Sequence, residues 1–453
     1  MNNLSKKTFN ASLWVIFGYG FSQVIRLGGN LVLTRLLEPE LFGIMAIVWV
    51  VLNGVEMLSN IGLIPSVVRS SETAPSRFHD TVWTMKVIRG WLLFFIINIV
   101  ALYIYSQQVY SNVSPDSVYA FAVLPWVLAV VSVVPLLEGY GTLAVAIHTK
   151  NLNHKKLELM NISSKLLGMV AMISLAFYSP TIWSLVVGSL IASLSLLILT
   201  YSLFDIRHSH LLDKTIVRDV YNFGKWIFIA STLTYLVQQG DKLYFSTIIT
   251  PAELGVYSIA YMIINVFHSV LETLATKIWY PYFCNKVDDK DSFKSSYYRV
   301  KILNQISVFI VAIVLFVLGQ PIIDFLYDER YMAAGMMIKV LLISLMGVSI
   351  TGVSRVCLTA MGETKVQVQS MFIRGVVLVI TLPLLFNIFG FIGAILAYAL
   401  NIYFSIPIQL FWLKQAKILS FRGEALSFFI IISFGCVLYL LNPDFWLVIL
   451  GSM

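Results

Sequence analysis

The sequence predicts an all-α polytopic membrane protein, with two six-helix lobes related by a parallel internal repeat around a central cavity. Of its 453 residues, 58% are hydrophobic and only 12% are charged. Soluble domains carry about twice that share of charge. Apolar runs of about 20 residues, the length that crosses a bilayer, recur along the whole chain. A third observation, a repeat at a fixed offset, divides these runs into two halves.

The apolar runs give the expected spans, each bounded by polar or charged residues. A hairpin after the second lobe brings the prediction to about 14 helices, of which the last, in 443–453, is short. The expected spans are 12–37, 41–69, 82–105, 118–147, 158–178, 181–204, 222–249, 254–279, 298–326, 331–361, 366–387, 391–413 and 425–441.

The charges predict the domain organisation and the orientation. We expect an N-terminal lobe over 1–204, an amphipathic linker helix on the inner surface over 205–221, a second lobe over 222–413 and the extra hairpin over 414–453. If the N-terminus is cytoplasmic, the inner connections and their flanks hold 20 of the 31 Lys and Arg, whereas the outer side holds Arg35 and Arg330. This asymmetry obeys the positive-inside rule. It also accounts for the net charge of +8 without nucleic acid.

The repeat appears when residues 10–56 are shifted by 212 and compared without gaps to 222–268. An even number of spans separates the copies, so both halves face the same way, as in transporters built from parallel repeats. Rarer residue types match on this offset: Asn10 with Asn222, Trp14 with Trp226, Gly28 with Gly240, Pro39 with Pro251, Gly43 with Gly255, and Asn53 with Asn265.

A polar stripe follows one face of the first span and recurs in the seventh. Helical spacing aligns Tyr19, Gln23, Arg26 and Asn30, and the offset maps this face onto Ser231, Tyr235, Gln238 and Lys242. Lipid does not solvate such groups, so we expect both stripes to face protein or a water-filled cavity between the lobes. The alternative is that Arg26 and Glu56 form a buried pair, and that Asp241 and Lys242 do the same with neighbours, so that these charges only specify packing.

Bases outnumber acids within the spans, which favours a cavity for an anion. Arg26, Lys242 and Arg374 lie deepest, whereas Lys86, Arg89, Lys165, Lys277 and Arg355 are expected to snorkel toward span ends. The buried acids are Glu56, Glu138, Asp241 and Glu272. Arg suits phosphate because its planar fork binds two oxygens.

Ion coupling is a further hypothesis, with Glu56 and His268 as candidates. Glu56 maps onto His268 on the same offset, and both titrate. The chain has no nucleotide-binding loop of the GxxxxGK[ST] type, no spacing typical of a catalytic set and no metal-ligand pattern. We therefore predict no catalytic residues, no metal and no cofactor.

Four segments carry a resemblance to a known family: FHDTVWTMKVIRG (78–90), YNFGKWIF (221–228), QQGDKLYFSTIITPAELGVYSIAY (238–261) and LYDERYMAAGMMIKVL (326–341). They resemble polysaccharide and O-antigen flippases of the multidrug/oligosaccharidyl-lipid/polysaccharide exporter superfamily, and the resemblance runs from about residue 4 to residue 413. It implies a transporter in the bacterial inner membrane that moves polyprenyl-pyrophosphate-linked oligosaccharide from the cytoplasmic to the periplasmic leaflet by ion-coupled alternating access.

The resemblance also implies the site. Arg26, Lys242 and Arg374 become pyrophosphate contacts, Asp241 their partner or the coupling acid, and Tyr19 and Tyr235 contacts to sugars. Many relatives carry an acid where this chain has Asn60, which puts coupling at that position in doubt. The expected partners are the lipid-linked oligosaccharide and membrane lipids, and polysaccharide polymerase machinery is left open.

Two other function classes are weighed against this one. A multidrug or cation antiporter of the same superfamily would need acids in its cavity, and the excess of base argues against it. A membrane glycan polymerase or ligase would need a sizeable outer loop bearing Arg and His, which this chain lacks.

Overall fold

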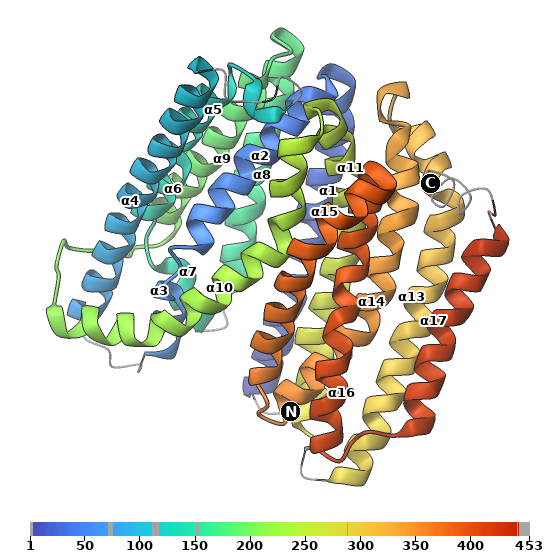
Figure 1. Cartoon of the computed structure of the whole chain (residues 1–453). Coiled ribbons are helices and arrows are strands. Elements are labelled where there is room, and N and C mark those ends of the chain that lie inside the picture. The colour runs from blue at the N-terminus through green and yellow to red at the C-terminus, as the bar shows by residue number, and fades with distance from the viewer. Residues whose placement is uncertain are drawn as a thin grey trace. The chain divides into compact units, whose positions relative to one another are not determined.

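Every regular element that the structure describes is a helix. The computed structural model describes residues 3–70, 76–110, 114, 117–150, 154–287, 289–441 and 443 (Figure 1). These helices form two compact units, Met1–Tyr235 with Ser246–Gly255 (unit 1) and Leu236–Phe245 with Val256–Met453 (unit 2). The predicted lobe boundaries at 204, 221 and 413 stay predictions.

Unit 1 contains the helices drawn from blue to green in Figure 1. Helices that follow one another along the chain pack together, such as α8 and α9, and α1 packs against α8. The elements are α1 (Asn3–Leu36), α2 (Pro39–Met57), α3 (Leu63–Arg69), α4 (Ser76–Val109), η1 (Val118–Ala120), α5 (Leu124–Val131), α6 (Val133–Tyr140), α7 (Ala144–Lys150), α8 (His154–Tyr178), α9 (Ile182–Leu203) and most of α10 (Lys214–Ile248).

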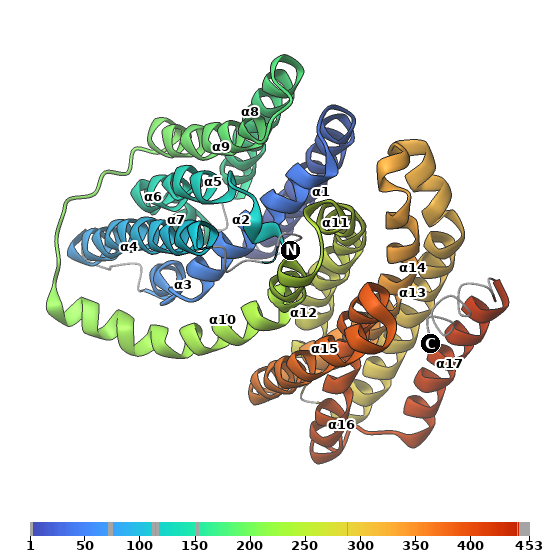
Figure 2. The same cartoon turned by 45° about the horizontal axis from the view of Figure 1, so that its top comes forward.

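Unit 2 contains the helices from yellow to red. Figure 2 shows α13 beside α14 on one side and α17 on the other, and both pairs are in contact. The first turn of α11, residues 251–255, belongs to unit 1. The elements are the rest of α11 (Pro251–Leu274), η2 (Ala275–Trp279, a π-helix), α12 (Tyr280–Cys284), α13 (Lys290–Leu326), η3 (Glu329–Tyr331), α14 (Ala333–Ala360), α15 (Lys365–Asn401), η4 (Ile402–Ser405), α16 (Ile406–Gln415) and α17 (Phe421–Leu441).

The described residues contain nine helices that are long and apolar enough to cross a membrane, or ten if the bent pair α5/α6 and α7 counts as one span. The chain is therefore a polytopic all-helical membrane protein. Neither α1 nor α10 is among the nine, although they have 34 and 35 residues. Both helices are long enough to span a membrane, but the polar residues of the predicted stripes lower their mean hydropathy.

Two of the expected spans are broken rather than continuous, which corrects the prediction for 41–69 and 118–147. Between α2 and α3 the chain turns at Gly62, whose φ of 67° lies in the left-handed region that glycine tolerates. The second break bends the axis by 51° between Leu124–Tyr140 and Ala144–Lys150. Apolar runs predict length but not continuity.

Two bases on α4 bind backbone carbonyls at these breaks. Lys86 Nζ donates to the carbonyl of Gly141 (2.8 Å), just after α6. Arg89 Nη2 donates to the carbonyl of Glu56 (2.7 Å) in the last turn of α2, and its Nε donates to Ser59 Oγ (3.0 Å). Cations are favoured at helix C-termini, where carbonyls lack partners. Lys86 and Arg89 therefore bind within the protein, which corrects the expectation that they snorkel.

The expected boundary between 366–387 and 391–413 is confirmed at Gly390. This residue lies inside α15 with φ 61° and ψ −150°, a conformation open almost only to glycine. The helix therefore consists of two arms, one on either side of Gly390.

The linker between α9 and α10 corrects the prediction of a surface helix over 205–221. Residues 204–213 have no helix, and α10 starts at Lys214 and runs on through the next span. Ile216 and Val220 pack against a cluster on α3, α4 and α7 instead of lipid. The predicted helical face of Leu212, Ile216 and Val220 is therefore only partly realised, because Leu212 lies outside the helix and is exposed.

Residues 204–213 form a strap that runs along α4. Alternate strap amides donate to α4 side chains: Ser209 to Asp80 Oδ1 (3.0 Å), Leu211 to Thr84 Oγ1 (3.0 Å) and Asp213 to Thr81 Oγ1 (3.3 Å). The His208 side chain, 3% exposed, accepts from the Leu143 amide through Nε2 (3.2 Å). These bonds supply the partners that a helix would have given the strap's backbone.

A buried ion pair fixes α17 on α13. Lys301 Nζ lies 2.7 Å from Glu424 Oε2, and the Tyr298 hydroxyl donates to Glu424 Oε1 (3.0 Å). One helical turn further, Gln305 Nε2 donates to Ser427 Oγ (2.8 Å). Helix α17 thus confirms a helix over the expected run 425–441. The expected short helix in 443–453 lies outside the described residues, apart from residue 443.

The crossing of α2 with the first turn of α11 is reciprocal. A Cβ added to Gly43 would lie 1.9 Å from the carbonyl oxygen of Pro251, and one added to Gly255 would lie 2.0 Å from that of Pro39. Pro39 and Gly43 match Pro251 and Gly255 on the predicted offset of 212. The same two residue types therefore make the same contact in both directions, as a two-fold axis requires, which supports the repeat.

Gly43→Ala and Gly255→Ala are each expected to destabilise the protein by about 1–3 kcal/mol, because the new methyl group overlaps backbone that then has to move. Thermal unfolding in detergent would measure the loss. Gly28→Ala in α1 is the matched control, since an added Cβ there has no neighbour within 4 Å. Equal stability of all three variants would contradict the close crossing.

The strap should loosen in acid. Burial lowers the pKa of His208, outweighing the nearby Asp80 carboxylate that raises it. A folded-state pKa below the unfolded value of about 6.5 means that His208 supports the strap above that pH and loses this support as the pH falls. Hydrogen exchange at Leu143 and in the strap, corrected for intrinsic rates, should therefore accelerate several-fold below about pH 6.

His208→Gln should remove this pH dependence, because an amide oxygen accepts the Leu143 bond without titrating. His210→Gln is the control that should keep it, because His210 is an exposed strap residue whose ring is tilted against Trp83 at 4.9 Å between centroids. Unchanged pH dependence in His208→Gln would show that another group titrates.

Candidate functional site

Unit 2 holds a buried polar cluster built from α10, α11 and α15. Asp241 is fully buried and Lys242 is 8% exposed, although they are adjacent on α10. Successive helical residues point about 100° apart, so the acid and the base reach different neighbours. The two charged side chains therefore contact different residues of α11.

Asp241 is held by α11. Tyr257, also fully buried, donates its hydroxyl hydrogen to Asp241 Oδ2. The Tyr257 ring in turn packs edge-on against Phe245 and Phe391, with centroids 5.0 and 6.0 Å away. A carboxylate in such apolar surroundings depends on its few hydrogen bonds, because burying it without them is costly.

Lys242 lies over an aromatic ring. Its Nζ is 3.7 Å from the centroid of the Tyr261 ring and donates to Gln239 Oε1 (3.2 Å). An ammonium group has three donors, and the ring face stabilises positive charge without using one. Lys242 is thus a buried cation held by a ring and one neutral amide, with donor capacity beyond the Gln239 bond.

Arg374 contributes the second base, from the first arm of α15. Its Nε donates to Asn401 Oδ1 (2.9 Å), and Asn401 Nδ2 donates back to the carbonyl of Arg374 (2.6 Å). This reciprocal pair joins the two arms of α15 across Gly390 and orients the guanidinium plane. The Nη groups, which bind oxyanions in a fork, lie outside that pair.

Aromatic residues connect the two bases. The rings of Tyr257 and Tyr261 are 6.0 Å apart, as are those of Tyr261 and Tyr398. Tyr261 and Tyr398 are both electrostatic neighbours of Arg374. His268 belongs to the same region, since Arg374 is its main charged neighbour and its Nε2 lies 3.2 Å from Ser344 Oγ on α14.

The structure thus gathers four predicted residues in unit 2: Asp241, Lys242, His268 and Arg374. Its charged residues are two bases, Lys242 and Arg374, and one acid, Asp241, so the bases outnumber the acid. Sequence reasoning missed its tyrosines and its amide, which are Tyr257, Tyr261, Tyr398 and Asn401. The spacing of Tyr257 and Tyr261, four residues apart on one helical face, was the available signal.

The α10 stripe does not form one continuous polar face. Ser231 accepts from Asn60 Nδ2 (3.3 Å), and Tyr235 donates to the carbonyl of Val50 (3.2 Å) against Gly54. Both belong to unit 1, as do the groups they bind. Gln238 is exposed, and only Lys242 reaches the unit 2 cluster. The Tyr235 hydroxyl therefore serves helix packing.

The α1 stripe lies beside the seam between α1 and α8. Gly18 and Gly29 approach Glu158 and Met169 of α8 so closely that an added Cβ would overlap them. The stripe residues, which are Tyr19, Gln23, Arg26 and Asn30, lie about a quarter-turn from that seam. Arg26 is also an electrostatic neighbour of Lys165 on α8. All four stripe side chains are half-buried.

Glu56 belongs to a second charged cluster, inside unit 1. A cavity of about 250 Å³ is lined by Glu56, Asn60, Lys86 and Arg89 among others. Glu138 on α6 is an electrostatic neighbour of both bases and of Glu56. Because Lys86 and Arg89 already bind helix-end carbonyls, this cluster has a clear part in holding α2, α4 and α6 together. In the part of the chain that the structure describes, no three His, Cys, Asp or Glu residues group as metal ligands.

Tyr257→Phe should destabilise the protein by about 1–3 kcal/mol, because it leaves a buried carboxylate oxygen without its donor. Thermal unfolding in detergent would show the loss. Tyr103→Phe on α4, where the ring is 63% exposed, is the control expected to change nothing. A Tyr257→Phe variant as stable as this control would mean that the hydroxyl does not hold Asp241.

The chain is similar to proteins of bacterial polysaccharide synthesis. A model of the family described as "Polysaccharide biosynthesis protein" matches residues 32–336. The "Lipopolysaccharide biosynthesis protein WzxC" of Escherichia coli (strain K12) is 21% identical over 339 residues, 73% of this chain and 65% of that protein. The "Succinoglycan biosynthesis transport protein ExoT" of Rhizobium meliloti (strain 1021) is 19% identical over 69% of this chain and 61% of that protein. The alignments thus span just under two thirds of each relative's length.

Solved structures with a similar fold are also transporters. "Lipid II flippase MurJ, inward closed conformation" superposes with a TM-score of 0.67 over 97% of this chain and 99% of that one, at 13% identity. An inward-facing MATE-family multidrug resistance transporter gives a TM-score of 0.67 over 87% and 94%, at 12% identity. At these identities the likeness establishes the fold.

Proposed function

We propose a transport cycle for this chain, which belongs to the polysaccharide biosynthesis protein family and is a multi-pass membrane transporter rather than an enzyme. In this cycle a polyprenyl-pyrophosphate-linked oligosaccharide moves from the cytoplasmic to the periplasmic leaflet of a bacterial inner membrane. The N-terminus is cytoplasmic. The unit then joins a growing polysaccharide such as O-antigen, capsule or exopolysaccharide.

The observation that carries this proposal is the positive charge of the unit 2 cluster. Lys242, which is buried, and Arg374, which is half-buried, outnumber the buried Asp241, and charge removed from solvent is costly unless a partner compensates it. A pyrophosphate supplies the missing negative charge, with several oxygens for the Nη groups of Arg374 and the ammonium of Lys242. A carrier of organic cations would favour the opposite balance.

Aromatic and amide groups around the bases fit the sugar part of the substrate. Tyr261 and Tyr398 present ring faces and hydroxyls beside Arg374, which is how proteins contact the apolar faces and edges of sugars. On α1, we propose that Arg26 forms a second phosphate contact, with Tyr19, Gln23 and Asn30 beside it. Gln238 is exposed on α10, and Tyr235 supports that helix through Val50.

We further propose alternating access between two six-helix lobes around a central cavity, coupled to an ion gradient. The reciprocal contact of Gly43 and Gly255 supports the repeat on which such a cycle depends. Asp241 is the first candidate for coupling, because it neighbours a substrate-binding base on the same helix turn. Glu56 and His268 are the others, each with a charged residue as an electrostatic neighbour.

Lys242→Ala and Arg374→Ala should each reduce polymer export at least tenfold, because a charged contact to phosphate is worth about 1.5–3 kcal/mol. Cells carrying these variants should accumulate the lipid-linked unit on the cytoplasmic leaflet, at unchanged protein level. Arg218→Ala, at an exposed position of α10, is the control. Normal export by both variants would rule out the cluster as the anion site.

The same cells test the coupling acid. Asp241→Asn should lose the dependence of export on the proton or sodium gradient. Retention of the wild-type dependence would remove Asp241 as the coupling group and leave Glu56 and His268.

A further inference from the structure

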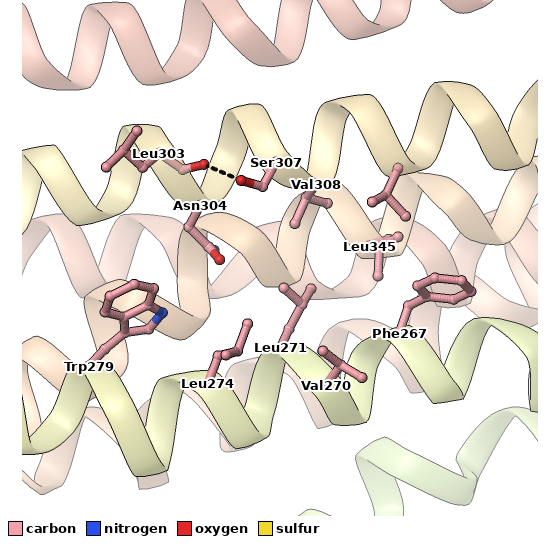
Figure 3. Close-up of a pocket in the computed structure, with 11 residues that line it drawn as sticks. Phe267, Val270, Leu271, Leu274, Trp279, Leu303, Asn304, Ser307, Val308 and Leu345 are labelled. Atoms are coloured by element: carbon pink, nitrogen blue, oxygen red, sulfur yellow. Dashed lines mark hydrogen bonds between the residues drawn. The ribbon is translucent and has the colours of Figure 1, made fainter. Parts of the chain in front are cut away.

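An apolar groove runs between α11 and α13 in unit 2, with α14 behind it. Figure 3 shows side chains from the facing helices pointing into the space between them, with Trp279 and Asn304 at one end and Phe267 and Leu345 at the other. The groove encloses about 260 Å³. Its lining residues are Phe267, Val270, Leu271, Leu274, Trp279, Leu303, Asn304, Ser307, Val308, Val311 and Leu345.

The groove borders the outer, apolar surface of its helices. Val270 and Leu303 line it and are 44% and 55% exposed, and Ile306 and Ile310 continue the same exposed surface along α13. In a membrane this surface faces hydrocarbon. A molecule that fills the groove therefore enters from the lipid phase and has a hydrocarbon part.

One end of the groove is polar. The Trp279 indole Nε1 is buried and has no hydrogen-bond partner in the described part of the chain, whereas Asn304 Nδ2 is satisfied by the carbonyl of Ser349 (2.8 Å). Buried indole N–H groups usually find an acceptor. The missing partner is thus an oxygen, and it belongs at the Trp279 end.

The local backbone places this donor. Trp279 ends the π-helix η2, Ala275–Trp279, an irregularity that is frequent at functional sites. Because a π-turn holds one more residue than an α-turn, Trp279 is rotated relative to the rest of α11. An anionic oxygen, as in a phosphate, is the acceptor that makes the stronger bond to such a donor.

We propose that the groove binds the hydrocarbon chain of a polyprenyl phosphate carrier, with its phosphate oxygen at Trp279. This rests on the proposed function, which supplies the carrier lipid. The groove lies between α11 and α13, and its volume of about 260 Å³ holds part of one hydrocarbon chain, which fits a carrier with one chain better than a phospholipid with two.

Photolabelling of the full-length protein in nanodiscs tests the groove. The probe is a polyprenyl phosphate with a diazirine on its chain, and the comparison is a phosphatidylglycerol with a diazirine on one acyl chain. The polyprenyl probe should label peptides of α11 and α13. Leu271→Trp, which fills the groove, should lower this labelling about tenfold, a loss of about 1.4 kcal/mol of binding. Ile310→Trp, on the exposed face of α13, should not.

Trp279→Phe tests the polar end with little change in volume. It should weaken binding of polyprenyl phosphate about tenfold, the value of a hydrogen bond to a charged group, and leave binding of uncharged polyprenol unchanged. Equal loss for both lipids would overturn the assignment of the phosphate to Trp279.

Two results would overturn the groove itself: full labelling in Leu271→Trp, or equal labelling by the phosphatidylglycerol probe at the same peptides. Neither result bears on the export proposal, which is judged by Lys242 and Arg374. Conversely, groove labelling with normal export in Lys242→Ala and Arg374→Ala would keep the lipid site and remove the proposed anion site.

Discussion

The structure depends on one constraint: hydrocarbon offers no hydrogen bonds, so the protein must satisfy each polar group that it places within the membrane. Regular helices meet this constraint for their own backbone. The consequences appear where the helices are interrupted. The carbonyls at the ends of α2 and α6 are bound by Arg89 and Lys86, and the extended strap donates its amides to Asp80, Thr81 and Thr84.

The same constraint separates charges that hold the fold from charges that are open to a ligand. Lys301 has Glu424 as its partner, and Arg89 has the end of α2. Lys242 and Arg374 differ, because a ring and neutral amides hold them and one carboxylate lies nearby. We propose that an anion balances their surplus charge in the α10–α11–α15 cluster. Trp279 repeats this pattern in the apolar groove, where a buried donor has no acceptor among the described residues.

Close helix contacts add a second requirement, for small residues. Gly43 and Gly255 let backbone meet backbone where α2 crosses the start of α11. The two contacts are equivalent on the sequence offset, so the same Pro and Gly pair supplies both sides of the crossing. A repeat that is visible mainly in Trp, Pro, Asn and Gly is thus explained at these positions by packing. The polar stripe residues of the repeat have different surroundings in its two copies, α1 and α10.

The sequence by itself determined the fold class, most of the helices and the protein family, because hydropathy and composition report the transfer of each residue into lipid. It placed Lys242 and Arg374 among the deep bases, and Gly390 between two helices. Only the tertiary structure decided which side chains meet. The breaks at Gly62 and Gly141, the strap, and the partners Tyr257, Tyr261 and Asn401 depend on contacts between segments far apart in the chain, which a local pattern of hydrophobicity does not encode.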